Sequence, residues 1–485
     1  YSHSAEIRTV SEDSSKPIRT LAVKIVAPSA KLKNNQIVVN VPNVRKPVPL
    51  FILMRALGII SDKSIIECCL LDLNKYDIFI DLFIPSIHDA GLIFNQEIAL
   101  KYIATFTKGK TIPHVLEILS NYLLPNIGEL NFYNKALFIG YMVRELLLVF
   151  NGNKKPTDRD SFKYKRVELA GELLYDLFRE YYTLEQRNIY QKIDKEYYYK
   201  QGAYQNNFVS LIETNYRDFF KDRIVESGFK KAFKGNWGAE EHTKRLGVVQ
   251  DIIRLSFNSY ASIMRKINLP LDSSAKVVGP RLLHSSQWGI IDPVDTPDGG
   301  NIGLHKHMSI LAKITKKCSA KPLIKWLKKN TNMNILEELN FEELAYYTKV
   351  FVNGSWVGSI NEAQLLMDLL ISFRRNALIS IYTSVSWDIK DNNIYIFTDG
   401  GRLCHPVFYK NNEKDRISID NDYIIDKISN DNFTWDKLIS GVNNKKLKLD
   451  KNCEVFNKIN DLYDATNIDE LKEKQAIIEY IDTSE

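Results

Sequence analysis

Hydrophobic residues follow two different periodicities in the first third of the chain. Up to about residue 45, "TLAVKIVAP" and "QIVVNVPNV" carry apolar residues that alternate or run together between turn residues, which predicts β-strands. After two prolines, "VPLFILMRALGI" (48–59) predicts a buried helix with Gly58 near its C-terminus. From 62 to about 150, apolar residues recur at i, i+3 and i+4, which predicts a series of helices.

A polar, charged stretch, "NGNKKPTDRDSFKYKR" (151–166), interrupts this pattern and indicates a domain boundary. Helical spacing resumes over 167–233 and is followed by a polar loop, 234–247, that glycines bracket. The stretch "VVQDIIRLSFNSYASIMRKI" (248–267) has helical apolar spacing. It therefore predicts one long helix, from which three basic side chains extend outward: Arg254, Arg265 and Lys266.

The last third of the chain has strand signals and then a polar tail. "VFVNGSWVGSI" (350–360) predicts a β-hairpin with Asn353-Gly354 as a type I′ turn. "NNIYIFTDGGRLCHPVF" (392–408) predicts a strand, a glycine turn and a second strand, and the charged tail 409–478 contains short helical patterns.

Positive charge is concentrated in the middle of the chain. The 485 residues carry a formal net charge of +6. The window 221–281 holds twelve basic and six acidic residues, so its charge equals that of the whole chain. Local positive charge is typical of surfaces that contact phosphates, although a solvated basic face is an equally good explanation of charge alone.

Composition narrows the class of protein further. The length of 485 residues is enough for about three domains, and with 45% hydrophobic residues ordinary cores can be buried. The five cysteines form no CxxC pair, which argues against a disulfide framework or a cysteine zinc site and favours a reducing compartment. No apolar run of membrane-spanning length and no signal peptide occurs, so no membrane partner is expected. The sequence begins at Tyr1 rather than at methionine, and we expect it to be a segment of a longer protein.

The stretch 284–309, "HSSQWGIIDPVDTPDGGNIGLHKHMS", is rich in residues that can carry chemistry. His305 and His307 would point to one face of a strand, and His284 is a possible third zinc ligand. Asp295 or Asp298 would then supply a base. The alternative is a pair of surface histidines on either side of Lys306, and spacing alone favours that alternative.

The glycines of the same stretch suggest a structural role. Neither G-x-G-x-x-G nor a Gly-Lys-Ser/Thr loop is present, so a nucleotide-binding loop is not supported. "TPDG" (296–299) instead fits a type I β-turn, and Gly299, Gly300 and Gly303 allow close backbone approach. A serine or cysteine nucleophile has no motif, and the acid pairs in 158–160 and 420–422 are best explained as solvated turn residues.

The stretch from 280 to 309 closely resembles the signature of the second-largest subunit of multisubunit DNA-directed RNA polymerases, of the eukaryotic or large-DNA-virus type. Asp295 and Asp298 replace the glutamates usual in that family. Further segments resemble the eukaryotic-type subunit in the same order: "AEIRTV", "KPVPLFILMRALGI", "DRDSFKYKRVELAGELL", "GNWG", "RLGVVQ", "FVNGSWVG", "IFTDGGRLCHPVF" and "EYID". The tail 409–478 matches least.

This resemblance implies an α+β multidomain architecture. It assigns residues 1–160 to the lobe, 161–234 to the C-terminal part of the protrusion, 235–310 to the fork with its two fork loops, and 311–485 to the external domains. In the family, the fork lies beside the RNA–DNA hybrid, where the basic window of this chain also falls.

The resemblance also implies site residues and partners. The basic residues predicted to contact nucleic acid are Lys244, Arg245, Arg254, Arg265, Lys266, Lys276 and Arg281. The structural signature comprises His284, Trp288, Gly289, Thr296, Pro297, Asp298, Gly299 and Gly303. The implied partners are the largest subunit and other polymerase subunits, the DNA template, the RNA–DNA hybrid, and initiation factors on the lobe. No catalytic residue is expected here, no cofactor is expected in this segment, and Mg²⁺ is expected on the largest subunit.

Two alternatives remain open at this point: a non-catalytic, nucleic-acid-binding regulatory paralogue, and a metal hydrolase built on His284, His305 and His307. The expected location depends on the source of the protein. It is the nucleus for a cellular enzyme, and a cytoplasmic viral factory or the virion for the enzyme of a large DNA virus.

Overall fold

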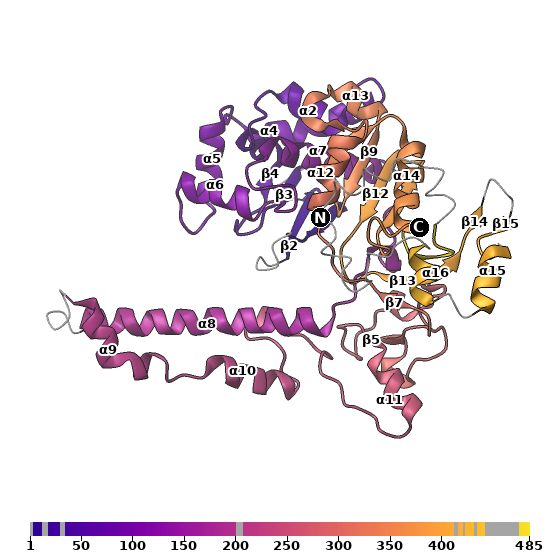
Figure 1. Cartoon of the computed structure of the whole chain (residues 1–485). Helices are drawn as coiled ribbons and strands as arrows, with labels where there is room; N and C mark the ends of the chain where they lie inside the picture. Colours follow the sequence, from indigo (N-terminus) through magenta and orange to yellow (C-terminus); the bar gives the residue numbers. More distant parts are fainter. Residues whose placement is uncertain are drawn as a thin grey trace. The chain divides into compact units, whose positions relative to one another are not determined.

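The structure is a computed structural model (Figure 1), and it describes residues 3–11, 18–29, 34–199, 207–411, 416–420, 422–430, 434–441 and 475–485. It divides into two compact units. The first unit comprises Tyr1–Asp158, Lys317–Asp399 and Val407–Glu485, and the second comprises Arg159–Lys316 and Gly400–Pro406. These units do not coincide with the four segments expected from the sequence, whose assignment to lobe, protrusion, fork and external domains stays a prediction.

The N-terminal part of the first unit contains a four-stranded antiparallel sheet and a layer of helices. The strands, in the order β1-β2-β3-β4, are β1 (His3–Thr9), β2 (Arg19–Ile25), β3 (Ile37–Asn40) and β4 (Val48–Pro49). The helices are α1 (Leu50–Ala56), α2 (Asp62–Leu70), α3 (Asp77–Ile80), α4 (Ile84–Ala90), α5 (Gln96–Ala104), α6 (Ile112–Asn121) and α7 (Phe132–Phe150). The strands predicted before residue 45 and the helices predicted over 48–59 and 62–150 are confirmed.

A buried arginine joins two parts of this helical layer. Arg55 of α1 donates hydrogen bonds to the carbonyls of Ile60 and Ile93 and forms an ion pair with Asp62 at the start of α2. The side chain is almost completely buried, and a buried charge is tolerated only when such partners satisfy it.

The second part of the first unit contains a five-stranded mixed sheet in the order β11-β12-β9-β10-β8. Its elements are α12 (Lys321–Asn330), β8 (Asn334–Ile335), α13 (Phe341–Tyr346), β9 (Thr348–Val352), β10 (Ser355–Ile360), α14 (Ala363–Arg375), β11 (Ser384–Asp388) and β12 (Asn393–Phe397). The β9–β10 hairpin is confirmed: Asn353 and Gly354 have φ of 48° and 79°, as a type I′ turn requires.

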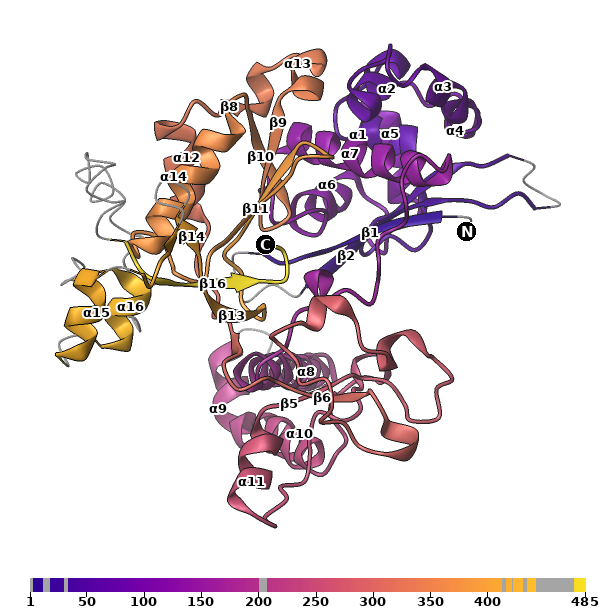
Figure 2. The same ribbon diagram turned by 90° about the vertical axis from the view of Figure 1, so that its right-hand side faces the viewer.

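This sheet is buried on both faces, as alternate residues of β9 show. Val350 and Val352 belong to a core that includes Trp326 of α12 and Phe373 of α14, whereas Phe351 belongs to the larger core of the helical layer. Figure 2 shows α12 and α14 on one side of the sheet and α7 on the other. Because successive side chains of a strand point to opposite faces, both surfaces of β9 are covered and all five of its residues are buried.

The C-terminal elements are short. They are β13 (Leu403–Phe408), β14 (Lys410–Asn411), β15 (Arg416–Ile417), α15 (Asp422–Ser429), α16 (Trp435–Ser440) and β16 (Ile478–Asp482). The two strands predicted over 392–408 are therefore present as β12 and β13. Short helices occur in the described part of the tail, and the rest of the tail predictions lie outside the described residues.

The second unit is mainly helical at its start. Its helices are α8 (Ala170–Tyr199), α9 (Phe208–Phe219), α10 (Ile224–Phe233) and α11 (Phe257–Met264), and its strands are β5 (Lys266–Asn268), β6 (His305–His307) and β7 (Lys313–Ile314). Tyr181 of α8 lies against Gly228 of α10, where any side chain would collide with the ring. The helices predicted over 167–233 are confirmed.

The single helix predicted over 248–267 is wrong. Only 257–264 is helical, Ser256 caps it by accepting a hydrogen bond from the Ser259 amide at 3.1 Å, and 266–268 forms strand β5. Apolar spacing stabilises a helix only where its apolar face is buried, and Ile252, Ile253 and Leu255 are all exposed. Strand β5 gains ladder hydrogen bonds with β6 instead.

None of the helices among the described residues has the length and apolar character needed to cross a membrane.

Candidate nucleic-acid interface

The predicted basic residues lie on the loops and short elements that surround the β5–β6 pair. Lys266, Ile267 and Asn268 of β5 pair antiparallel with His307, Lys306 and His305 of β6. The loop 234–256 and helix α11 precede this pair, and the segment 269–304 connects its strands. The pair therefore provides the frame that positions the basic side chains.

Arg281 is held by backbone carbonyls rather than left free. Its guanidinium donates to the carbonyls of Gly300 at 2.7 Å and Ile302 at 2.9 Å, and it also reaches those of Val277, Ser273 and Ala275. These contacts join the start of the connecting segment to its end. They use all three guanidinium nitrogens, so Arg281 serves mainly as a clamp, and its predicted phosphate contact stays untested.

Arg265 has a similar arrangement. Its Nη2 donates to the carbonyl of Ser309 at 2.6 Å and reaches those of Ile310 and Ala312 at 3.2 Å. The Arg265 side chain therefore ties the end of α11 to the chain that follows β6, and only part of its guanidinium remains available to a ligand.

Two more of the predicted residues have partners within the unit. Arg245 forms an ion pair with Glu168, and its amide donates to the carbonyl of Trp237. Lys266 lies 3.3 Å from the Gln250 side-chain oxygen, a single contact that an ionic ligand can replace.

Lys244, Arg254 and Lys276 are the predicted residues best placed to meet a ligand. All three side chains are exposed, and none makes a hydrogen bond or ion pair with the described residues. An unpaired exposed cation loses little on leaving water and gains a charge-assisted contact with a phosphate. Their contact with nucleic acid stays a prediction, like that of the whole set.

The signature residues act through the backbone. The Thr296 hydroxyl donates to the His305 carbonyl at 3.0 Å and accepts from the Gly303 amide at 2.9 Å, so it fastens the glycine-rich segment to β6. Gly303 has φ of 70°, and a Cβ there would collide with the carbonyl of Arg281. This position therefore requires glycine.

The predicted type I turn at 296–299 is wrong. Asp298 is extended, with φ of −78° and ψ of 167°, whereas a type I turn needs ψ near 0° at that position. Gly299, with φ of 71°, instead begins a 3₁₀ turn over Gly299–Asn301. Pro297, which directly precedes Asp298, is half-buried.

The remaining signature residues lie on the segment between Arg281 and β6. Trp288 is 87% exposed, and the adjacent Gly289 has φ of 71° with His405 packed against it. Nδ1 of His284 accepts a hydrogen bond from the Ser286 amide at 3.1 Å.

The three histidines do not form a metal site. His284 is engaged by Ser286, and Nδ1 of His307 lies 2.9 Å from the Ser262 hydroxyl and 3.4 Å from Asp295. Burial, with the nearby Lys266 and His307 charges, lowers the pKa of His305. Across the described part of the chain, no three His, Cys, Asp or Glu side chains are grouped so that they could hold a metal ion. The geometry thus gives the metal-hydrolase alternative no support.

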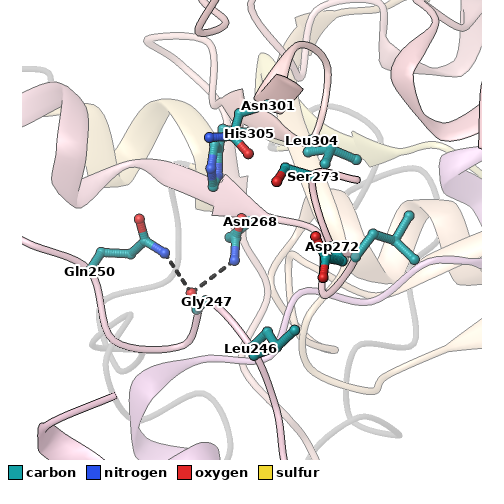
Figure 3. A pocket seen from close by; sticks show the side chains of 10 residues that line it. Leu246, Gly247, Gln250, Asn268, Asp272, Ser273, Asn301, Leu304 and His305 are labelled. Atoms are coloured by element: carbon teal, nitrogen blue, oxygen red, sulfur yellow. Dashed lines mark hydrogen bonds between the residues drawn. The ribbon is translucent and has the colours of Figure 1, made fainter. Parts of the chain in front are cut away.

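A pocket of about 270 Å³ opens beside the β5–β6 pair (Figure 3). The amides of Gln250 and Asn268 both donate to the Gly247 carbonyl, at 2.7 and 2.8 Å. Other polar and apolar side chains complete the lining: Asp272, Ser273, Asn301, His305, Leu246, Leu271 and Leu304. Of these residues only His305 was singled out from the sequence, as a possible metal ligand. The side chains of Gln250, Asn268 and Asn301 carry no charge, so the charge pattern gave no signal for them.

Comparisons with known proteins identify three separate segments. Residues 22–168 match the family model "RNA polymerase Rpb2, domain 2", residues 250–314 match "RNA polymerase Rpb2, domain 3", and residues 350–411 match "RNA polymerase Rpb2, domain 4". The match over 350–411 covers most of the β9–β10 hairpin and strands β11 and β12, and the match over 250–314 covers the β5–β6 pair.

Individual relatives match most of the chain. The chain is 32% identical over 424 residues to "DNA-directed RNA polymerase II subunit RPB2" of Schizosaccharomyces pombe, which is 84% of the chain and 34% of that protein. It is 34% identical over 452 residues to the protein of the same name from Encephalitozoon cuniculi, covering 91% of the chain and 38% of the relative. It is 34% identical over 427 residues to "DNA-directed RNA polymerase II subunit 2" of Arabidopsis thaliana, covering 85% and 35%. The chain thus spans roughly a third of the length of these relatives.

Proposed function

Since this chain belongs to the Rpb2 family of second-largest RNA polymerase subunits, we propose that it forms part of the cleft of a DNA-dependent RNA polymerase and contacts DNA and the RNA–DNA hybrid during transcription. The observation that carries the proposal is a group of exposed cations around the segment matched to domain 3, Lys244, Arg254 and Lys276, which have no charge partner among the described residues. These side chains suit a phosphate backbone, and contacts of that kind carry no sequence information.

In this proposal the chain acts as a scaffold for chemistry carried out elsewhere in the enzyme. The clamps made by Arg265 and Arg281 keep the loops rigid, so that the exposed cations stay in place. Mg²⁺, which supports nucleotidyl transfer in the proposed whole enzyme, would be bound by the largest subunit.

The partners follow from the same proposal. They are the largest subunit, other polymerase subunits, the DNA template and the hybrid, with initiation factors on residues 1–160. The proposed location is the nucleus for a cellular enzyme and a viral factory or the virion for a viral one.

The proposal is tested by removing the three free cations together. In the full chain, K244A/R254A/K276A is expected to weaken binding to an RNA–DNA hybrid and to lower the slope of log K against log salt by about 2 to 3, because each lost phosphate contact removes roughly 0.7 to 0.9. Binding is measured by fluorescence anisotropy between about 50 and 200 mM salt.

The matched control keeps the charges and changes only the side chains. K244R/R254K/K276R is expected to retain the slope of the unmodified chain, since phosphate contacts of this kind depend mainly on charge. If the alanine variant keeps the original slope while remaining folded, these residues do not contact nucleic acid and the proposal loses its main support.

A further inference from the structure

A second basic surface lies in the other unit, on helix α12. Between residues 317 and 330 the chain contains five lysines and no acidic residue: Lys317, Lys321, Lys325, Lys328 and Lys329. The next acidic residue along the chain is Glu337. Neither the charge window 221–281 nor the signature segment includes this stretch.

The fold presents three of these lysines on one face of α12. Lys321, Lys325 and Lys328 follow i, i+4, i+7 spacing, which places them on the same side of a helix. The opposite side carries Leu323, Trp326 and Leu327, which are buried against the mixed sheet. Figure 2 shows α12 lying along that sheet beside α14.

These three lysines have no charge partner within the described chain. Each is exposed, and none makes an ion pair or side-chain hydrogen bond with the described residues. Other exposed lysines of the same unit are paired, as with Lys101 and Glu97 at 2.6 Å and Lys63 and Glu67 at 3.6 Å. The lysine face of α12 is therefore unlike the exposed helix faces that contain ion pairs.

The arrangement is unfavourable for the helix itself. Like charges at i, i+3 and i+4 repel, and Lys321 begins the helix, where the helix dipole disfavours a cation. Only the lysines of the last turn, Lys328 and Lys329, are in a place that the dipole favours. Capping and burial of α12 thus do not explain Lys321 and Lys325, whereas an anionic ligand does.

We propose that the Lys321, Lys325 and Lys328 face of α12 binds the phosphodiester backbone of a nucleic acid, through residues of a different compact unit from the one that contains β5 and β6. Lys321 and Lys328 are about 10 Å apart along the helix axis, at 1.5 Å per residue. At about 3.4 Å per phosphate, this length spans about three phosphates of one strand.

The chemistry of the face favours a nucleic acid over an acidic protein. The side chains that carry the charge are all lysines, and the aromatic residue of the helix, Trp326, is 5% exposed. A protein partner is normally held by buried apolar or aromatic anchors, and this face offers none among the described residues of α12. Point charges without anchors fit a sequence-independent phosphate contact.

The test replaces the three lysines and measures salt dependence in the full chain. K321Q/K325Q/K328Q is expected to lower the slope of log K against log salt by about 2 for a mixed-sequence single-stranded RNA and by about 3 for a DNA duplex. The two probes distinguish the source of the phosphates, and a loss with either one supports the proposal. K321R/K325R/K328R, which keeps the charges, is expected to bind like the unmodified chain.

A second measurement locates the contact directly. Acetylation of lysine amines in the presence of each nucleic acid is expected to show protection of Lys321, Lys325 and Lys328 and no change at Lys101. Unchanged slopes in the glutamine variant with both probes would overturn the proposal. So would tight binding of an acidic peptide that the glutamine variant loses while its nucleic-acid slopes stay the same, since the partner would then be a protein.

The test of the α12 face is independent of the test of Lys244, Arg254 and Lys276. The glutamine variant leaves Lys244, Arg254 and Lys276 intact, and the earlier alanine variant leaves α12 intact. Each variant reports on its own surface, so one proposal can fail while the other holds.

Discussion

At the scale of the residue, the segment around β5 and β6 depends on a few side chains that satisfy backbone groups. Arg281 and Arg265 together donate to eight backbone carbonyls, and Thr296 bridges β6 and Gly303. Long loops carry many carbonyls that would otherwise need water, and a guanidinium can satisfy several of them at once. The sequence shows where the arginines are. Which carbonyls they bind depends on where the following segments of the chain fold back.

Gly303 provides a test of this packing at a single position. G303A is expected to destabilise the second unit by about 3 kcal/mol or more. The backbone at this position is left-handed, which disfavours any Cβ, and the new Cβ would also collide with the carbonyl of Arg281. G299A is the matched control, since Gly299 has nearly the same φ but no atom within 4 Å of a Cβ, and a loss of about 1 kcal/mol is expected.

Denaturant unfolding of the two variants, followed by circular dichroism, makes the comparison. Equal losses for the two glycines would show that backbone conformation alone matters and that the close approach to Arg281 does not.

At the scale of the element, the sequence predicted secondary structure well where an apolar face is buried and poorly where it is not. Helices α1 to α7 carry their apolar residues into one core, and α8, α9 and α10 were also located correctly. The stretch 248–256 has the same kind of spacing, but most of its apolar residues are exposed and it forms no helix. Periodicity describes a possible face, and burial decides whether the face stabilises a helix.

Strand β9 contains a buried lysine, Lys349, among apolar residues that cannot stabilise its charge. Lys349 is 2% exposed. Burial lowers its pKa from 10.5 to about 7, and the charge of Arg144 acts in the same direction, whereas Glu145 partly opposes the shift. The neighbouring carboxylates of Glu145 and Asp391 are both paired with Lys154. Lys349 therefore reduces the stability of the sheet whenever it is charged.

K349M is expected to stabilise the first unit at pH 6.5 by on the order of 1–3 kcal/mol, since methionine keeps the volume and removes the charge. The folded pKa of Lys349 lies below its unfolded value, so the cost is full below pH 7 and disappears as the pH rises toward 10.5. The gain from K349M should therefore shrink at higher pH.

Denaturant unfolding at pH 6.5 and pH 10 provides the measurement, with K63M at an exposed site as the control. A gain of the same size at both pH values would mean that the charge of Lys349 is not the cause.

At the scale of the whole molecule, segments distant in sequence form each compact unit. The first unit joins Tyr1–Asp158 to Lys317–Asp399, and contacts such as Asn126 to Ser355 at 2.7 Å link them. The second unit takes in Gly400–Pro406, where the Gly401 carbonyl accepts from the Val167 amide at 2.8 Å. A division of the chain into consecutive segments could not anticipate this arrangement, because local patterns carry no information about which distant segments pack together.

The activity of the chain by itself is also a matter of this scale. The chain spans about a third of the length of its relatives. Its match to the Schizosaccharomyces pombe subunit covers 34% of that protein. We predict that the purified chain, given template, nucleotides and Mg²⁺, makes no RNA, because the proposed role is to shape a cleft and hold nucleic acid. Incorporation of labelled nucleotide above the background of a denatured sample would contradict this prediction.

The sequence by itself determined the family, the positions of most helices and strands, and the concentration of positive charge in the middle of the chain. These properties depend on residue type and short-range spacing, which are written in the sequence directly. The tertiary structure decided which cations are free. It assigned Arg265 and Arg281 to backbone carbonyls, left Lys244, Arg254 and Lys276 exposed, and turned the lysines of α12 away from the core. The physical reason is that the availability of a charge depends on the groups that folding brings beside it, and those groups come from distant parts of the chain.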